Sequence, residues 1–137
     1  MFGYDPMREP LMPFDETTPP EPPVYIVMDS NLLIAEDLCG SLQAAGPCRV
    51  INAPHPDELI RILEGETRVS AAFLEMRYDQ VLQAGLDSAL SLRGARIVLT
   101  MGEEDEIKVA KQGWAMLVRP FTEDMIRGVL RPMVNGV

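Results

Sequence analysis

Cysteine and histidine are scarce in this sequence, and their scarcity excludes two kinds of site. The 137 residues contain two cysteines, Cys39 and Cys48, and one histidine, His55. Two cysteines do not make the disulfide framework of a small secreted domain, and no CxxC pair is present to suggest a zinc site. We therefore expect a reduced, cytoplasmic protein in which Cys39 packs as a small apolar side chain.

Lysine is also rare, and no long apolar run occurs. Only two of the twelve basic residues are lysines, and the net charge is −9. Binding to a nucleic-acid backbone depends on clustered Lys and Arg, so we expect no nucleic-acid partner. The apolar run at residues 24–28 is too short to cross a bilayer, and the first ten residues do not resemble a signal peptide. We therefore expect no membrane association and no targeting segment.

The chain divides into an unusual leader and one domain. Residues 1–23 hold seven of the twelve prolines, which prevents any regular element there. Apolar side chains nevertheless recur in this segment every two to four residues, which a free linker does not need. We interpret 1–23 as a proline-rich N-terminal extension, either a disordered leader or a strap that docks on this domain or a partner. Residues 24–134 form the domain, and 47% apolar residues are enough for its core.

Strand-like and helix-like segments alternate from Val24 onward. Short apolar runs predict five strands, at residues 24–28, 49–53, 69–74, 95–100 and 115–118. Helical periodicity and capping residues predict five helices, over 32–45, from Pro56, over 79–92 with a break or kink at Gly85, over 103–112, and from Thr122 to Pro132. Strict alternation implies right-handed βαβ crossovers and a parallel sheet covered on both faces. The fold class is therefore α/β, a flavodoxin-like doubly wound five-stranded sheet of order 2-1-3-4-5.

Functional side chains in this architecture lie beyond the carboxyl ends of the strands. The first, third, fourth and fifth strands are read in VYIVMDSN, AAFLEMR, RIVLTMG and AMLVRPFTED. On these segments the chain resembles the CheY-like receiver domains of two-component response regulators, over about residues 24–131. The phrases LLIAEDLCGSLQAAG and LVRPFTEDMI are also similar to the first and last helices of that family.

The resemblance assigns a role to each strand end, and the acidic positions depart from the family. A working receiver has an acidic pair after its first strand and a phosphoacceptor aspartate after its third. Here the pair becomes Met28 and Asp29, and Glu75 stands at the acceptor position. A thioether is a poor ligand for Mg²⁺. We therefore expect weak or absent Mg²⁺ binding, with Asp29 and Glu75 as the remaining candidate ligands.

The other positions of the receiver pattern are partly kept. The hydroxyl position is Thr100, the lysine position is Arg119 followed by the family's Pro120, and the aromatic switch position is Met116. Glu75 either mimics a phosphoaspartate that meets Thr100 and Arg119, or these three residues form a structural polar cluster. Arg77 either supplies a fixed cation in place of the metal or points to solvent.

The resemblance implies a stand-alone degenerate receiver, or pseudo-receiver, that is not an enzyme and has no catalytic residue. It would act in two-component-type signal transduction by phosphorylation-independent protein–protein interaction. Its partner would be a sensor kinase, a response regulator, another signalling protein or a second copy of the chain. The contact surface would be the face of the fourth helix, fifth strand and fifth helix, or the N-terminal extension. This face or its vicinity contains Met116, Met125, Val129, Met133 and Val134.

Two alternatives remain. The first is a still-active phosphoacceptor, at Glu75 or Asp29, that serves as a phosphate relay or sink. The second is a flavodoxin-like small-molecule site, which is the least favoured because DSNLL follows the first strand where a Gly-rich phosphate loop would stand.

Overall fold

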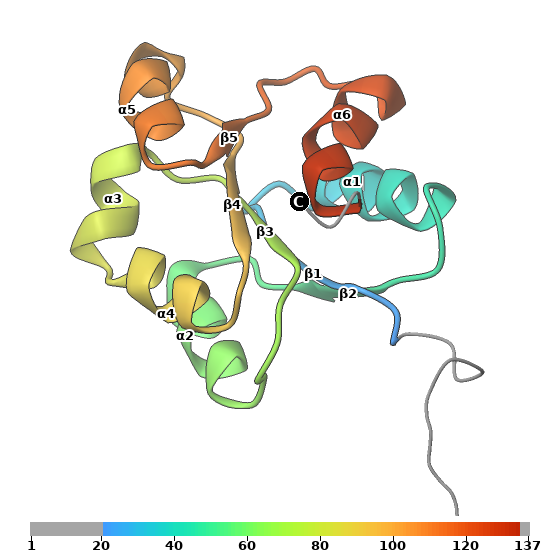
Figure 1. Ribbon diagram of the computed structural model, residues 1–137, viewed down its shortest axis with the longest axis horizontal. Helices are drawn as coiled ribbons and strands as arrows, with labels where there is room; N and C mark the ends of the chain where they lie inside the picture. Colours follow the sequence, from blue (N-terminus) through green and yellow to red (C-terminus); the bar gives the residue numbers. More distant parts are fainter. Residues whose placement is uncertain (1–20, 135–137) are drawn as a thin grey trace, which may run out of the picture.

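The computed structural model describes residues 21–134, and its elements form a parallel sheet with helices on both faces (Figure 1). The strands are β1 (Val24–Met28), β2 (Arg49–Asn52), β3 (Ala71–Leu74), β4 (Arg96–Leu99) and β5 (Ala115–Met116). All four neighbouring pairs are parallel, and the order is β2-β1-β3-β4-β5. The predicted flavodoxin-like sheet is confirmed. Residues 1–20 of the proline-rich extension 1–23 lie outside the described residues, so its two interpretations, a disordered leader and a docking strap, are not tested.

The described residues form six α-helices, one more than the five predicted. They are α1 (Leu32–Ala44), α2 (Pro56–Glu64), α3 (Tyr78–Gln83), α4 (Leu86–Leu92), α5 (Glu106–Lys111) and α6 (Glu123–Val134), with a 3-10 turn, η1, at Glu103–Asp105. The extra helix arises because Gly85 has φ +71°, a left-handed conformation that ends α3 before α4 begins. The predicted helix over 79–92 is therefore two short helices.

Helix ends follow local signals in two cases and depart from them in a third. The side chain of Asn31 caps α1 by accepting hydrogen bonds from the backbone of Leu33 and Ile34. The hydroxyl of Thr122 accepts from the Met125 N–H, as the predicted cap of α6 requires. The prediction that Pro132 ends α6 is wrong, because the helix continues to Val134. A proline so close to a helix end removes one backbone hydrogen bond and has almost no following helix to kink.

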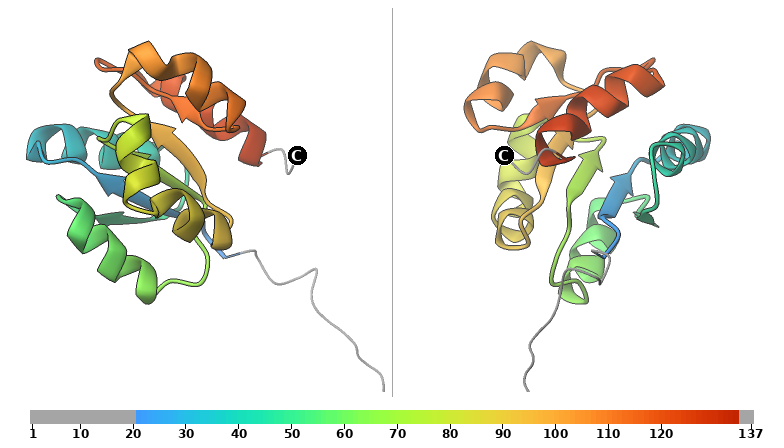
Figure 2. Two further views of the ribbon diagram at one scale, coloured as in Figure 1. Left: turned by 90° about the vertical axis from the view of Figure 1, so that its left-hand side faces the viewer. Right: turned by 45° about the vertical axis from the view of Figure 1, so that its right-hand side comes forward.

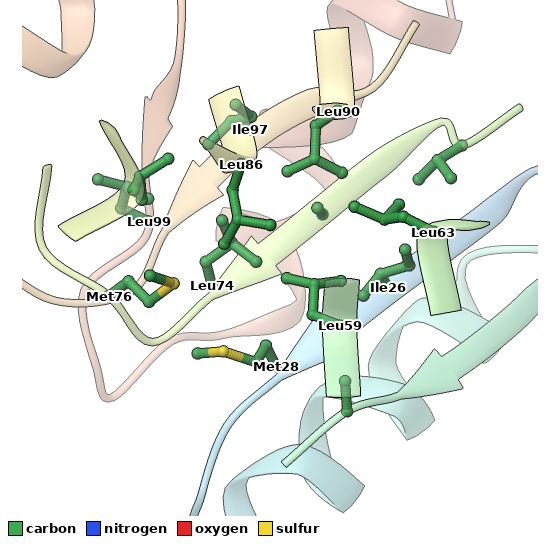
Figure 3. Close-up of a cluster of buried hydrophobic side chains, with 14 of the residues drawn as sticks. Ile26, Met28, Leu59, Leu63, Leu74, Met76, Leu86, Leu90, Ile97 and Leu99 are labelled. Atoms are coloured by element: carbon green, nitrogen blue, oxygen red, sulfur yellow. The ribbon is translucent and has the colours of Figure 1, made fainter. Parts of the chain in front are cut away.

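Two apolar cores lie on opposite faces of the sheet. The strands alternate their side chains, so Ile26 and Met28 pack under α2, α3, α4 and α5, while Tyr25 and Val27 pack under α1 and α6. Figure 2 shows α1 and α6 together on one side and the shorter helices on the other. We call these the α2–α5 core, drawn in Figure 3, and the α1–α6 core. Each fully buried aliphatic side chain contributes about 1.5–3 kcal/mol, which holds the strand ends in place.

The last strand is shorter than predicted. The β4–β5 ladder contains only Ala115 and Met116, although the Leu117 N–H still donates to the Leu99 carbonyl at 2.8 Å. The chain then leaves the sheet and reaches Arg119 within two residues. Within residues 21–134, no helix has both the length and the apolar character that a membrane span needs.

Candidate functional site

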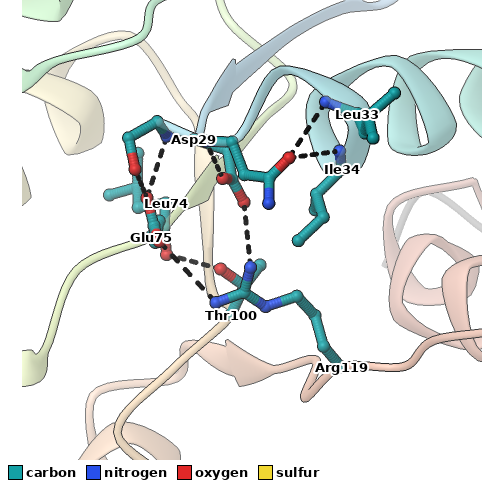
Figure 4. A network of polar contacts seen from close by, with 9 residues as sticks. Asp29, Leu33, Ile34, Leu74, Glu75, Thr100 and Arg119 are labelled. Atoms are coloured by element: carbon teal, nitrogen blue, oxygen red, sulfur yellow. Dashed lines mark hydrogen bonds and ion pairs between the residues drawn. The ribbon is translucent and has the colours of Figure 1, made fainter.

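Four polar side chains converge at the carboxyl edge of the sheet (Figure 4). Asp29, Glu75, Thr100 and Arg119 follow β1, β3, β4 and β5, and parallel strands bring these ends to one edge. Asp29 and Thr100 are the only buried polar residues of the described part of the chain. Burying polar groups is costly without partners, so the contacts of this cluster determine what it can do.

Arg119 places its guanidinium between the two carboxylates. Its Nη1 lies 3.9 Å from Asp29 Oδ2, and its Nη2 lies 3.6 Å from Glu75 Oε2. Both contacts are ion pairs, and their N···O distances are too long for direct hydrogen bonds. The side chain of Arg119 is 32% exposed, whereas that of Asp29 is only 3% exposed. The chain thus supplies its own cation to a pair of acids at the edge of the sheet.

Asp29 is held in place by the start of α1. Its Oδ1 accepts a hydrogen bond from the Asn31 N–H at 2.8 Å. Burial, helped by the negative charge of Glu75, raises the pKa of Asp29 above its ordinary value, and the Asn31 bond and the Arg119 charge only partly oppose this.

Glu75 is held by the same loop between β1 and α1, through Ser30. Its Oε1 accepts from both the backbone N–H and the hydroxyl of Ser30, each at 2.9 Å. Burial raises the pKa of Glu75, but the two Ser30 bonds and the Arg119 charge outweigh it, and the pKa lies below its ordinary value. The two neighbouring acids are therefore shifted in opposite directions, and Glu75 is the more readily ionised.

Thr100 does not take part in the contact that the sequence suggested. Its hydroxyl donates to the Leu74 carbonyl at 3.3 Å and makes no hydrogen bond to Glu75. Of the expected meeting of Glu75, Thr100 and Arg119, the structure brings together Glu75 and Arg119. Met116, at the switch position, is half-buried and packs against the α2–α5 core.

The residues present do not fit a magnesium ion. Met28 is 3% exposed and packs in the α2–α5 core, so its side chain is not available at the polar cluster (Figure 3). Mg²⁺ requires a nearly octahedral shell of oxygen ligands. Here two carboxylates remain, and both face a guanidinium. No three His, Cys, Asp or Glu side chains are grouped to hold a metal ion anywhere in residues 21–130.

Arg77 lies outside the cluster. Its guanidinium pairs with Glu104 of η1, and its side chain is 43% exposed. This pairing raises the pKa of Arg77, through a hydrogen bond and the opposite charge. Of the two interpretations of Arg77, the structure agrees with the one in which its side chain points outward, and the cation beside the two acids is Arg119.

Ser30, Leu32 and Leu33 were not singled out from the sequence. Ser30 follows Asp29 directly, and its position at a strand end was the available signal. Leu32 and Leu33 are 70% and 72% exposed at the start of α1. Both lie outside the face of α1 that packs inward, so the helical periodicity of the sequence already indicates that they are exposed.

The sequence matches no family model and no curated protein. The structure is similar to a response regulator from Thermotoga maritima, with a TM-score of 0.65, 16% identity, and coverage of 84% of this chain and 99% of that chain. It is also similar to the chemotaxis protein CheY4 of Vibrio cholerae, with a TM-score of 0.63, 16% identity, and coverage of 82% and 98%. A receiver protein from Burkholderia phymatum gives 0.60, 18% identity, and coverage of 84% and 96%. This chain therefore has the fold of the response-regulator receiver domains.

Proposed function

We propose that the chain is a pseudo-receiver that acts in two-component-type signalling by binding other proteins without being phosphorylated. The position of Arg119 is the observation that carries this proposal. Its guanidinium spans Asp29 and Glu75 and offsets part of their negative charge internally. In a working receiver, a bound cation and a free acceptor carboxylate share this place.

The setting of Glu75 supports the same view. Its side chain is about 1.5 Å longer than that of aspartate, and phosphoryl transfer tolerates little displacement of the reacting atom. Its Oε1 is already held by two hydrogen bonds from Ser30, and its Oε2 faces Arg119. A carboxylate restrained in this way is a poor nucleophile toward a phosphoryl donor. We propose on these grounds that Mg²⁺ binding is weak or absent and that the chain is not an enzyme.

The face made by α5, β5 and α6 is the proposed docking surface. It exposes Ile107 (73%) on α5 and Met125 (39%) on α6. Met116 and Val129, by contrast, are partly buried against the two cores. The side chains of Met133 and Val134 lie outside the described residues. Ile107 and Met125 are therefore the apolar side chains that a kinase, a regulator or a second copy of the chain would contact.

One observation favours the alternative of an active phosphoacceptor. Asp29 and Glu75 lie beside the same guanidinium, so two carboxylates are close together at the acceptor position. We rank this function second, because Arg119 competes directly with any cation that would join them.

The test separates phosphorylation from docking. The full chain is incubated with acetyl phosphate and Mg²⁺ and its intact mass is measured, with Glu75→Asp as the matched variant that carries the family's acceptor. We expect no stable phosphoryl adduct on the wild type. A stoichiometric adduct on Glu75 or Asp29 would overturn the proposal in favour of the phosphate relay.

Docking is tested by affinity capture from the native cytoplasm without a phosphoryl donor. We expect signalling proteins to be captured by the wild type and by Asp87→Asn, a surface change on α4, and to be lost with Ile107→Glu. Capture that requires acetyl phosphate, or that survives Ile107→Glu and Met125→Glu together, would count against this surface.

A further inference from the structure

A cavity of about 450 Å³ opens beside Glu75 on the side of the sheet covered by α2 and α3. Its walls come from the segments that follow β1, β2 and β3 and from α3. The chain reverses its direction of winding between β1 and β3, and open α/β sheets bind ligands in the crevice at that point. The volume is within the range of small-molecule sites. Glu75 belongs both to this cavity and to the acid–guanidinium contact, whereas Arg119 does not line the cavity.

Two methionines make the cavity apolar at its base. Met28 and Met76 line it and are 3% and 5% exposed. Figure 3 shows both side chains at the same end of the α2–α5 core. Thioethers are polarisable and pack well against the edge and face of aromatic rings. Met28, at a position where the receiver family has an acid, therefore helps to give the cavity an apolar base suited to a flat ring.

Polar groups are gathered around this apolar base. Glu75, Gln80, Gln83 and His55 all line the cavity. The Oε1 of Gln80 accepts from the Arg77 N–H at 2.8 Å, which leaves the two amide N–H donors of Gln80 for another partner. The Oε2 of Glu75 accepts no hydrogen bond from the described residues and faces Arg119 only as an ion pair. The cavity thus offers both donors and a charged acceptor.

The charges around the cavity select against anions. Glu75 has a lowered pKa and is ionised at neutral pH. No other carboxylate and no guanidinium is among the residues that line the cavity. No Gly-rich loop follows β1 to hold a phosphate. A ligand here gains from N–H donors or a positive charge and loses from a phosphate or carboxylate.

We propose that this cavity binds a flat nitrogen heterocycle bearing an amino or amidine group, neutral or singly positive, and no larger than a nucleoside. The ring lies against Met28 and Met76, its N–H groups donate to Glu75, and its ring nitrogens accept from the amides of Gln80 and Gln83. This site does not depend on the proposed docking function, which uses a different surface.

The test uses 2-aminobenzimidazole as the probe and benzoate as a flat probe of opposite charge. The ¹⁵N-labelled full chain is titrated with each, and backbone amide shifts are followed. We expect saturating shifts at Ser30, Met76, Gln80 and Gln83 with 2-aminobenzimidazole and none with benzoate. In Glu75→Gln the affinity falls about tenfold, as the loss of one charge-assisted hydrogen bond predicts.

Two matched tryptophan variants show whether the cavity itself is occupied. Ala84 is exposed, lines the cavity and has ordinary right-handed helical dihedrals, so Ala84→Trp fills the space without backbone strain. Ala110 is exposed on α5 and does not line the cavity. We expect Ala84→Trp to abolish binding and Ala110→Trp to leave it unchanged. Absence of saturating shifts, equal binding of benzoate, or binding that survives Ala84→Trp would overturn the proposal while leaving the docking test unaffected.

Discussion

Replacing Arg119 with methionine removes the cation that Asp29 and Glu75 share and keeps most of the side-chain volume. Asp29 then remains buried beside a second negative charge. Breaking a fully buried pair costs about 3–5 kcal/mol, whereas exposed pairs are worth about 0–1 kcal/mol. Here the two contacts are 3.9 and 3.6 Å long, and Arg119 is 32% exposed, so solvent screens part of the interaction. We expect Arg119→Met to lower the free energy of unfolding by about 1–2 kcal/mol near neutral pH.

The pH dependence of this loss distinguishes electrostatics from packing. The folded-state pKa of Asp29 is raised, so its stability contribution is fully present below its ordinary pKa and is lost as the pH rises through the raised value. Without Arg119 this pKa rises further, because the guanidinium was lowering it. The destabilisation caused by Arg119→Met should therefore grow as the pH increases through the acidic range toward neutrality.

Urea unfolding followed by Trp114 fluorescence, at several pH values, measures this loss. Arg127→Met is the matched control, since Arg127 is 51% exposed and its ion pairs within the described residues are with Glu123 and Asp124 on its own helix. We expect that control to cost at most about 0.5 kcal/mol, with little pH dependence. The reasoning fails if Arg119→Met is as stable as the wild type, or if its loss is largest at low pH.

Three further predictions concern residues around the site and the helix break. Gly85→Ala should destabilise the chain by about 1 kcal/mol because φ is +71°, whereas Gly40→Ala in the middle of α1, with open space at the Cβ position, should stabilise it by about 0.5–1 kcal/mol. Thermal unfolding measures both changes in stability, and changes of the same sign would contradict the assignment of the helix break to Gly85. Ser30→Ala removes the hydroxyl bond to Glu75 and should raise the pKa of Glu75. The stability that this carboxylate contributes is lost as the pH falls through its folded-state pKa, so in the variant it should be lost at a higher pH. NMR titration of the carboxyl group measures this pKa, and an unchanged value would show that the backbone bond from Ser30 is sufficient. Met28→Asp buries a charge in the α2–α5 core and should lower the free energy of unfolding by about 2–5 kcal/mol, whereas Met28→Leu should lower it by less than about 1.5 kcal/mol. If urea unfolding shows that the aspartate is well tolerated, the side chain at position 28 reaches the polar cluster.

The pairing of Glu75 with Arg119 bears on the idea that Glu75 mimics a phosphorylated aspartate. A phosphoryl group has three strong acceptor oxygens, whereas Glu75 has two. One of these two oxygens already accepts two hydrogen bonds from Ser30. Thr100 bonds the Leu74 carbonyl instead. The structural polar cluster is therefore the better description of these residues, and Arg119 is the only part of the proposed mimicry that is in place.

Much of the fold was decided by local sequence signals. Continuous apolar runs marked the strands, and their alternation with amphipathic segments indicated a parallel sheet joined by crossovers. Five such strands suit the order 2-1-3-4-5, which the structure has. Asn31 and Thr122 located helix starts, since a cap depends only on residues two or three positions away. The strand ends then predicted that Asp29, Glu75 and Arg119 would meet at one edge.

Tertiary structure decided how the side chains at that edge are partnered. Ser30 and Glu75 are 45 positions apart, and Thr100 bonds a carbonyl 26 positions away, so no local pattern contains either contact. Whether the added cation came from Arg77 or from Arg119 depended on where η1 placed Glu104, which draws Arg77 away from the cluster. Met28 joined the α2–α5 core because the pleat of β1 turns alternate side chains toward that face. Periodicity determines which face a residue takes within an element, but beyond the strand ends the packing of distant loops determines the partner.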